Sequence, residues 1–196
     1  MMTEDIRNSV IQILDSLDGL SCSNSDQRQD WLDLLGQPPT GSSWDLDKPF
    51  KCWQDTTGHW HTQGISTCAL VALGIWRKIG VDADELYAPY KNGAAVSEVV
   101  AIAKKMGGWK SATCGETPNP GDVIVLSSPH EHVLTVYDFS DELNLISIDG
   151  GQTDINGLQA IKRCSREWSK KSYALMLGKS TIYGWADIST FTLKVD

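Results

Sequence analysis

The spacing of hydrophobic residues predicts helices in the first part of the chain. Between residues 4 and 18 the apolar side chains recur as one stripe that fits a single helix face, with Gly19 able to end the helix: Ile6, Val10, Ile13, Leu14 and Leu17. A second short helix is expected over residues 26–35, with Gly36 as its stop. Proline, glycine and serine then interrupt regular structure, so we expect a boundary near residue 48.

A different pattern follows residue 64, where the chain is apolar on nearly every helix face between Cys68 and Trp76. A helix with no polar face is buried in a protein core. Ser66 or Thr67 can cap its start and Gly80 can end it, which predicts a buried central helix over residues 67–79. A further amphipathic helix is expected over residues 93–106, before a pair of glycines.

Beyond this helix the pattern is typical of strands. A turn of sequence Pro-Asn-Pro-Gly-Asp at residues 118–122 leads into a strand-like run. We expect strands over residues 123–126, 132–138, 143–149 and 181–188. Residues 159–177 mix charged and aliphatic side chains without a clear period, so no element is predicted there.

Composition and charge narrow the class of protein. The chain has 196 residues, enough for one hydrophobic core with a small addition, and a net charge of −8. This acidity argues against a protein that binds nucleic acid through its overall field. The N-terminus is acidic where a signal peptide is basic, so we expect a protein that is cytoplasmic when made. No apolar run is long enough to span a membrane.

The chain contains five cysteines in no CxxC pair, and Cys68 is the one placed for chemistry. A thiol in the first turn of a helix lies at the positive end of the helix dipole, which favours the thiolate. The unpaired N–H groups of that turn can also hold an oxyanion. Taken alone, however, a cysteine on an apolar helix is more often a small buried hydrophobe.

His132 and Asp149 are the candidate partners of this thiol. A cysteine nucleophile needs a histidine base and a polar group that orients it. His132 begins one predicted strand. If the following hairpin turns on residues 140–141, Leu143 pairs with Asp138 and Asp149 with His132. A register shift of one or two residues would alter this pairing.

Four short motifs, in this order, resemble the papain-like NlpC-type and CHAP-type hydrolases. They are Ser-Thr-Cys at the start of the buried helix, Pro-Asn-Pro-Gly-Asp-Val-Ile-Val at 118–125, His-Val-Leu-Thr-Val at 132–136 and Ile-Asp-Gly-Gly-Gln at 148–152. The resemblance covers roughly residues 60–155. Each motif is weak alone, while their order and spacing are more specific.

The resemblance implies an α+β papain-like fold, with the buried helix packed on an antiparallel sheet built from residues 122–188. Residues 1–48 would be a helical extension or cap, and residues 49–196 the hydrolase domain. Cys68 would be the nucleophile and His132 the base. The CHAP-type pattern often reads Glu-Gly-Asn where this chain has Asp149-Gly-Gly, so either Asp149 or Gln152 would orient the histidine.

Such enzymes usually cut amide or peptide bonds of bacterial peptidoglycan, which makes the stem peptide the expected substrate. Delivery would be by a dedicated secretion system or by phage lysis, and an injected antibacterial effector would need a cognate immunity protein as partner. Two other functions stay open: a cysteine-dependent deamidase or transglutaminase-like enzyme, and a non-catalytic binding domain. We expect no cofactor.

Side chains outside this set are given structural roles. The pairs His59/His61 and His130/His132 have the spacing of some metal ligands, but no carboxylate or thiolate partner is placed with them, and no metal site is predicted. Gln63 is treated as a turn residue before the helix. The basic residues between 162 and 171 are expected on a solvated face.

Overall fold

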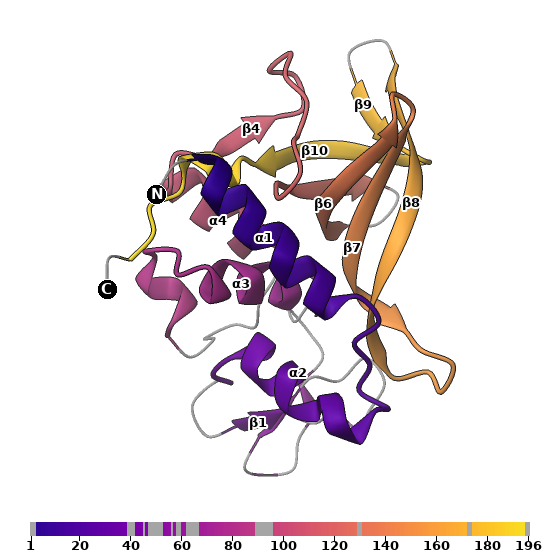
Figure 1. The fold of residues 1–196 in the computed structure, drawn as a ribbon. Coiled ribbons are helices and arrows are strands. Elements are labelled where there is room, and N and C mark those ends of the chain that lie inside the picture. The colour runs from indigo at the N-terminus through magenta and orange to yellow at the C-terminus, as the bar shows by residue number, and fades with distance from the viewer. Residues whose placement is uncertain are drawn as a thin grey trace.

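The computed structural model describes residues 3–38, 42–44, 46, 53–55, 57, 60–61, 67–88, 96–128, 131–171 and 174–194 (Figure 1). Its helices are α1 (Thr3–Leu17), α2 (Arg28–Leu35), α3 (Thr67–Lys78) and α4 (Val96–Lys105). Each lies within a few residues of its predicted range, and short 3-10 turns occur at η1 (Ser25–Gln27), η2 (Asp84–Leu86) and η3 (Ile188–Thr190). The predicted start of α4 at residue 93 falls outside the described residues.

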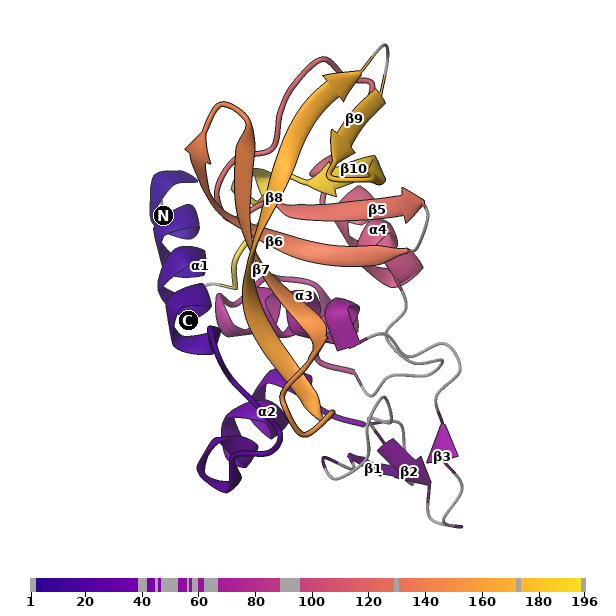
Figure 2. The ribbon, with the colours of Figure 1, turned by 90° about the vertical axis from the view of Figure 1, so that its right-hand side faces the viewer.

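The strands of the second half form a closed antiparallel barrel. Six strands pair in ring order: β5 (Val123–Ser128), β6 (His132–Asp141), β7 (Asn144–Thr153), β8 (Gln159–Lys171), β9 (Ala174–Leu177) and β10 (Ser180–Ala186). The ring closes because β10 pairs with both β9 and β5. A further strand, β4 (Trp109–Ser111), pairs with β10 outside the ring. Figure 2 shows β5 and β6 side by side at the centre of this arrangement.

The expected papain-like fold, a buried helix packed on an antiparallel sheet, is therefore wrong. Residues 159–177, to which no element was assigned, supply β8 and β9, and these two strands complete the ring. Their pattern escaped detection because β8 carries polar side chains on both faces, including Cys164 and Arg166 on the same face as Trp168. Closure satisfies the strand edges that an open sheet leaves exposed.

Two hydrophobic cores lie on the two sides of the barrel wall. Side chains of every barrel strand meet inside the ring, among them Ile124, Leu134, Trp168 and Trp185. Alternate residues such as Val125 and Val133 belong instead to a second core shared with the helices. Helix α3, buried from Thr67 to Trp76, runs through the second core and contacts the outside of β6 and β7. The prediction of a buried central helix is confirmed.

The first 36 residues contribute to this same second core. Side chains of α1 and α2 such as Val10, Leu14 and Trp31 are buried in it together with α3. A small sheet, β1 (Ser42–Trp44), β2 (Trp53–Asp55) and β3 (Trp60–His61), follows, and the indole of Trp44 donates a hydrogen bond to the carbonyl of Gly36 (2.6 Å). The expected domain boundary near residue 48 lies outside the described residues.

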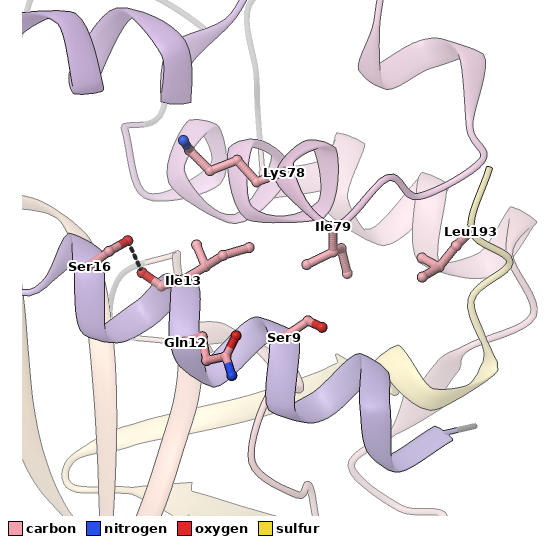
Figure 3. A pocket seen from close by; sticks show the side chains of 7 residues that line it. All are labelled: Ser9, Gln12, Ile13, Ser16, Lys78, Ile79 and Leu193. Atoms are coloured by element: carbon pink, nitrogen blue, oxygen red, sulfur yellow. Dashed lines mark hydrogen bonds between the residues drawn. The ribbon is translucent and has the colours of Figure 1, made fainter. Parts of the chain in front are cut away.

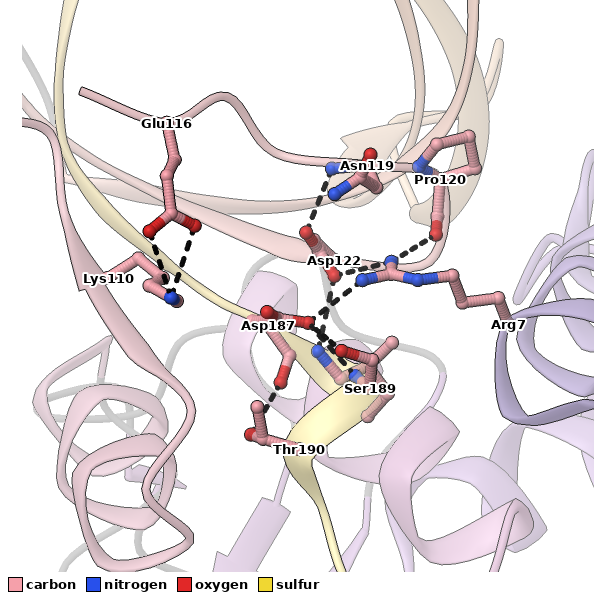
Figure 4. A network of polar contacts seen from close by, with 10 residues as sticks. Arg7, Lys110, Glu116, Asn119, Pro120, Asp122, Asp187, Ser189 and Thr190 are labelled. Atoms are coloured by element: carbon pink, nitrogen blue, oxygen red, sulfur yellow. Dashed lines mark hydrogen bonds and ion pairs between the residues drawn. The ribbon is translucent and has the colours of Figure 1, made fainter. Parts of the chain in front are cut away.

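Arg7 ties α1 to the turn that leads into the barrel (Figure 4). Its guanidinium donates to the carboxylates of Asp122 (2.7 Å) and Asp187 (2.8 Å) and to the carbonyl of Pro120 (2.7 Å). Asp122 is fully buried and also accepts hydrogen bonds from the backbone N–H groups of Asn119 and Ile188. The Pro-Asn-Pro-Gly-Asp motif thus fixes the first helix to the barrel.

A groove of about 360 Å³ lies between α1 and the C-terminal end of α3 (Figure 3). Ser9 and Ile13 of α1 face Ile79 and Leu193 across it, and Gln12 also lines it. Because Cys68 lies at the other end of α3, this groove is remote from the candidate nucleophile. Within the described ranges, no helix has the length and apolar character needed to span a membrane.

Candidate active site

Cys68 is the second residue of α3 and is buried, with 6% of its surface exposed. Two glycines of β7 allow this strand to approach the helix start. A Cβ on Gly150 would lie 3.0 Å from the carbonyl oxygen of Thr67, and one on Gly151 would lie 3.4 Å from the backbone nitrogen of Cys68. Gly151 also has a φ of 73°, which favours glycine. The Gly-Gly pair therefore allows β7 to pass beside the thiol.

His132, at the start of β6, hydrogen-bonds to Asp149 and interacts electrostatically with the sulfur of Cys68. Its Nε2 lies 2.8 Å from Oδ2 of Asp149, whose side chain is fully buried, whereas 21% of the histidine side chain is exposed. The structure thus brings together the three residues singled out from the sequence. Of Asp149 and Gln152, it is Asp149 that contacts the imidazole.

The predicted hairpin register is wrong by two residues or more. Thr135 pairs with Ile148, so Asp149 lies two positions short of the point directly opposite His132, and Asp138 pairs with Ile146 rather than Leu143. The chain turns later than expected, with bulges between residues 136 and 141. A shift of two residues keeps a side chain on the same face, so Asp149 still reaches the histidine as a diagonal neighbour.

Arg166 of β8 completes the surroundings of Asp149. Its guanidinium donates to both carboxylate oxygens, at 3.1 Å to Oδ1 and 2.5 Å to Oδ2. The hydroxyl of Ser147 donates to Oδ1 (2.6 Å) and accepts from the same guanidinium. Asp149 is thereby held by three side chains from three adjacent strands: His132, Ser147 and Arg166.

Neither Arg166 nor Ser147 was identified from the sequence, and Arg166 was assigned to a solvated basic face. The prediction is wrong for this residue, whose side chain is only 23% exposed. Its neighbour Arg163, 39% exposed, does face outward and pairs with Asp15 and Asp18 of the α1 end. Had β8 been recognised as a strand, Arg163 and Arg166 would have been placed on opposite faces, because odd and even positions of a strand alternate.

The electrostatics of the site follow from these contacts. Burial alone would lower the pKa of His132, but the hydrogen bonds to Asp149 and Cys68 outweigh it and raise the pKa to about 9. Burial alone would likewise raise the pKa of Asp149, but His132 and the Arg166 guanidinium hold it below its usual value. At neutral pH the imidazole is therefore protonated and lies between a carboxylate and the sulfur of Cys68.

Gln63, His59 and His130 fall outside the described residues. Within the described part of the chain no group of three or more His, Cys, Asp or Glu side chains is arranged to hold a metal ion. Cys114 and Cys164 carry free thiols, and Cys114 is exposed.

Cys68, His132 and Asp149 have the arrangement of a nucleophile, a base and an orienting carboxylate. They come from three elements, α3, β6 and β7, and the carboxylate has its own counterion on β8. Comparison of the chain with protein-family models, with curated proteins and with solved structures finds no match.

Proposed function

We propose that this protein is a cysteine hydrolase that cleaves amide bonds by acyl transfer through Cys68. The observation that carries the proposal is that His132 interacts with the sulfur of Cys68, at the first turn of a buried helix, while it hydrogen-bonds the buried carboxylate of Asp149. A core cysteine needs no imidazole partner. A histidine that bonds a sulfur on one side and a buried carboxylate on the other is the arrangement that activates a thiol.

The charge state of the pair supports this role. Because the pKa of His132 is about 9, the imidazole is protonated at neutral pH, and its positive charge stabilises a thiolate on Cys68. The N-terminal end of α3 adds a second favourable field, since Cys68 lies in the first turn, at the positive end of the helix dipole. A thiolate is the form that attacks a carbonyl carbon.

In the proposed reaction the thiolate of Cys68 attacks the amide carbon, and the carbonyl oxygen becomes an oxyanion. The backbone N–H of Cys68 is a candidate donor to that oxyanion. His132 gives its proton to the amide nitrogen, the C–N bond breaks and the amine leaves a thioester on Cys68. His132 then takes a proton from water, the hydroxide attacks the thioester, and the carboxylic acid is released, which regenerates the thiolate of Cys68 beside the protonated His132.

Asp149 and Arg166 act through the histidine. The carboxylate accepts from Nε2 and so leaves Nδ1 for the sulfur, which fixes the orientation of the ring. Arg166 and Ser147 in turn fix both oxygens of the carboxylate. The contacts of Arg166 and Ser147 keep Asp149 charged while the imidazole gains and loses its proton.

The substrate class that we propose is the stem peptide of bacterial peptidoglycan. Its support is the order and spacing of the four motifs that resemble NlpC-type and CHAP-type hydrolases, three of which contain the residues of the site. The papain-like fold, which the same resemblance implied, is not part of this support. If the protein is an injected antibacterial effector, we expect a cognate immunity protein in the producing cell.

The test is digestion of purified peptidoglycan, with the soluble fragments identified by mass spectrometry. Wild-type protein and the Cys114→Ala control, which removes an exposed thiol, should release the same fragments. Cys68→Ala should release none while its circular dichroism spectrum stays unchanged. Full activity of Cys68→Ala would refute the nucleophile assignment. Inert peptidoglycan together with conversion of protein glutamine to glutamate would show a deamidase instead.

A further inference from the structure

A second groove, of about 330 Å³, lies between α4, β5 and β10. Val96 and Val100 form its α4 wall, Val125 and Leu126 its β5 wall, and Tyr183 of β10 also lines it. Its volume is at the small end of the range for ligand sites, which suits one amino-acid side chain with its flanking peptide bonds better than a large cofactor. Half of its described lining residues are aliphatic.

This groove adjoins the proposed base. Leu126, in its wall, is the direct backbone partner of His132 in the β5–β6 ladder. Glu131, the residue before His132, also lines the groove. A ligand that contacts Leu126 and Glu131 therefore lies beside the backbone of His132, on the β5 side of its strand.

Glu131 is the one charged side chain among the described residues that line the groove. Ser97, Ser127 and the Tyr183 hydroxyl are neutral, Glu131 is a carboxylate, and none of the described residues that line the groove is a lysine or an arginine. Glu131 is exposed and, within the described part of the chain, forms no hydrogen bond or ion pair. An unpaired carboxylate at the end of an aliphatic groove complements an alkyl chain that ends in an ammonium group.

We propose that this groove is the specificity subsite of the enzyme and that it binds an amine-bearing aliphatic residue of the substrate, of the lysine type. The alkyl part of that residue contacts Val96, Val100 and Val125, and its ammonium group pairs with Glu131. The assignment to substrate rests on the proposed hydrolase function. The assignment of the ligand's chemistry rests only on the lining of the groove.

The binding test uses the Cys68→Ala variant, so that no turnover occurs. Nα-acetyl-lysine N-methylamide is titrated into isotope-labelled protein, with the norleucine and glutamate analogues as uncharged and anionic comparisons. Amide signals of α4 and of residues 125–127 should shift, and the lysine analogue should bind about fivefold more tightly than the norleucine analogue, as an exposed ion pair permits. Glu131→Gln should abolish this preference, whereas Glu142→Gln, at an exposed carboxylate of the β6–β7 turn, should keep it.

The outcomes separate this inference from the proposed function. Lysine-selective shifts in the groove without hydrolysis of peptidoglycan would support the subsite and refute the hydrolase. Hydrolysis with equal binding of the three analogues, or with shifts elsewhere, would overturn the subsite and leave the hydrolase standing. If both hold, Glu131→Gln should raise KM for the natural substrate several-fold and leave kcat unchanged, because Glu131 contacts no reacting atom.

Discussion

Asp122 allows a quantitative test, because its buried carboxylate makes the stability of the fold depend on pH in an unusual direction. Burial raises its pKa from 3.8 to about 6, and the hydrogen bond from Asn119 and the Arg7 guanidinium offset only part of that rise. A raised carboxyl pKa means that the folded protein binds the proton more tightly than the unfolded chain does. This contribution to stability is fully present below pH 3.8 and is lost as the pH rises through about 6.

The size of the effect follows from the shift. About two pKa units at about 1.4 kcal/mol per unit give a contribution of roughly 3 kcal/mol that disappears between pH 4 and pH 7. Other groups titrate in this range, so the useful quantity is the difference in unfolding free energy between the wild type and Asp122→Asn. From pH 4 to pH 7 the wild type should lose roughly 3 kcal/mol of unfolding free energy relative to Asp122→Asn.

The assay is urea denaturation at constant ionic strength in half-unit steps of pH, followed by tryptophan fluorescence. Asp30→Asn, at an exposed carboxylate, is the matched control and should show no comparable change. Arg7→Met should move the midpoint of the wild-type transition above pH 6, because the buried carboxylate loses its counterion. A difference between the wild type and Asp122→Asn that is flat with pH, or that grows with pH, would refute the reasoning.

Three further predictions concern the candidate site. Arg166→Gln should destabilise the fold by about 3 kcal/mol in urea denaturation at pH 7, because the buried carboxylate of Asp149 then keeps only His132 as a counterion. An unchanged midpoint would contradict the Arg166–Asp149 ion pair. Gly151→Ala should lower the hydrolytic rate constant about tenfold or more, since the new methyl group would lie 3.4 Å from the Cys68 nitrogen. An unaltered rate constant would show that this nitrogen is not an oxyanion donor. The rate at which iodoacetamide alkylates Cys68 should be nearly independent of pH between 6 and 8 in the wild type, and slow and steeply pH-dependent in His132→Gln. Identical pH–rate profiles for the two proteins would contradict the thiolate–imidazolium pair.

The helices and the chemistry-bearing residues could be predicted because their signals are local. The α1 stripe, the apolar run of α3 and the glycines that follow both helices lie within single windows of the chain. Cys68 was singled out by its place at a helix start, and His132 and Asp149 by short motifs around them. None of these inferences needed knowledge of which strands pair.

The hairpin register and the residues on β8 could not be predicted in the same way. Turn position and bulges decide whether Asp149 lies opposite His132 or two positions away, and neither can be found from alternation alone. Arg166 has the composition of a surface residue. Only its pairing opposite Leu145 of β7 places it beside Ser147 and Asp149.

By itself the sequence determined where the helices form and which thiol, imidazole and carboxylate are available to act together. The tertiary structure decided that β9 pairs with β10, so that the strands close into a barrel instead of forming a papain-like sheet. It also decided that a partly buried arginine, Arg166, holds the orienting carboxylate. Helix formation depends on neighbours three and four residues apart, which the sequence states directly. Barrel closure and the Arg166–Asp149 contact depend on pairing between strands, which is set by packing and by hydrogen bonds across the whole fold.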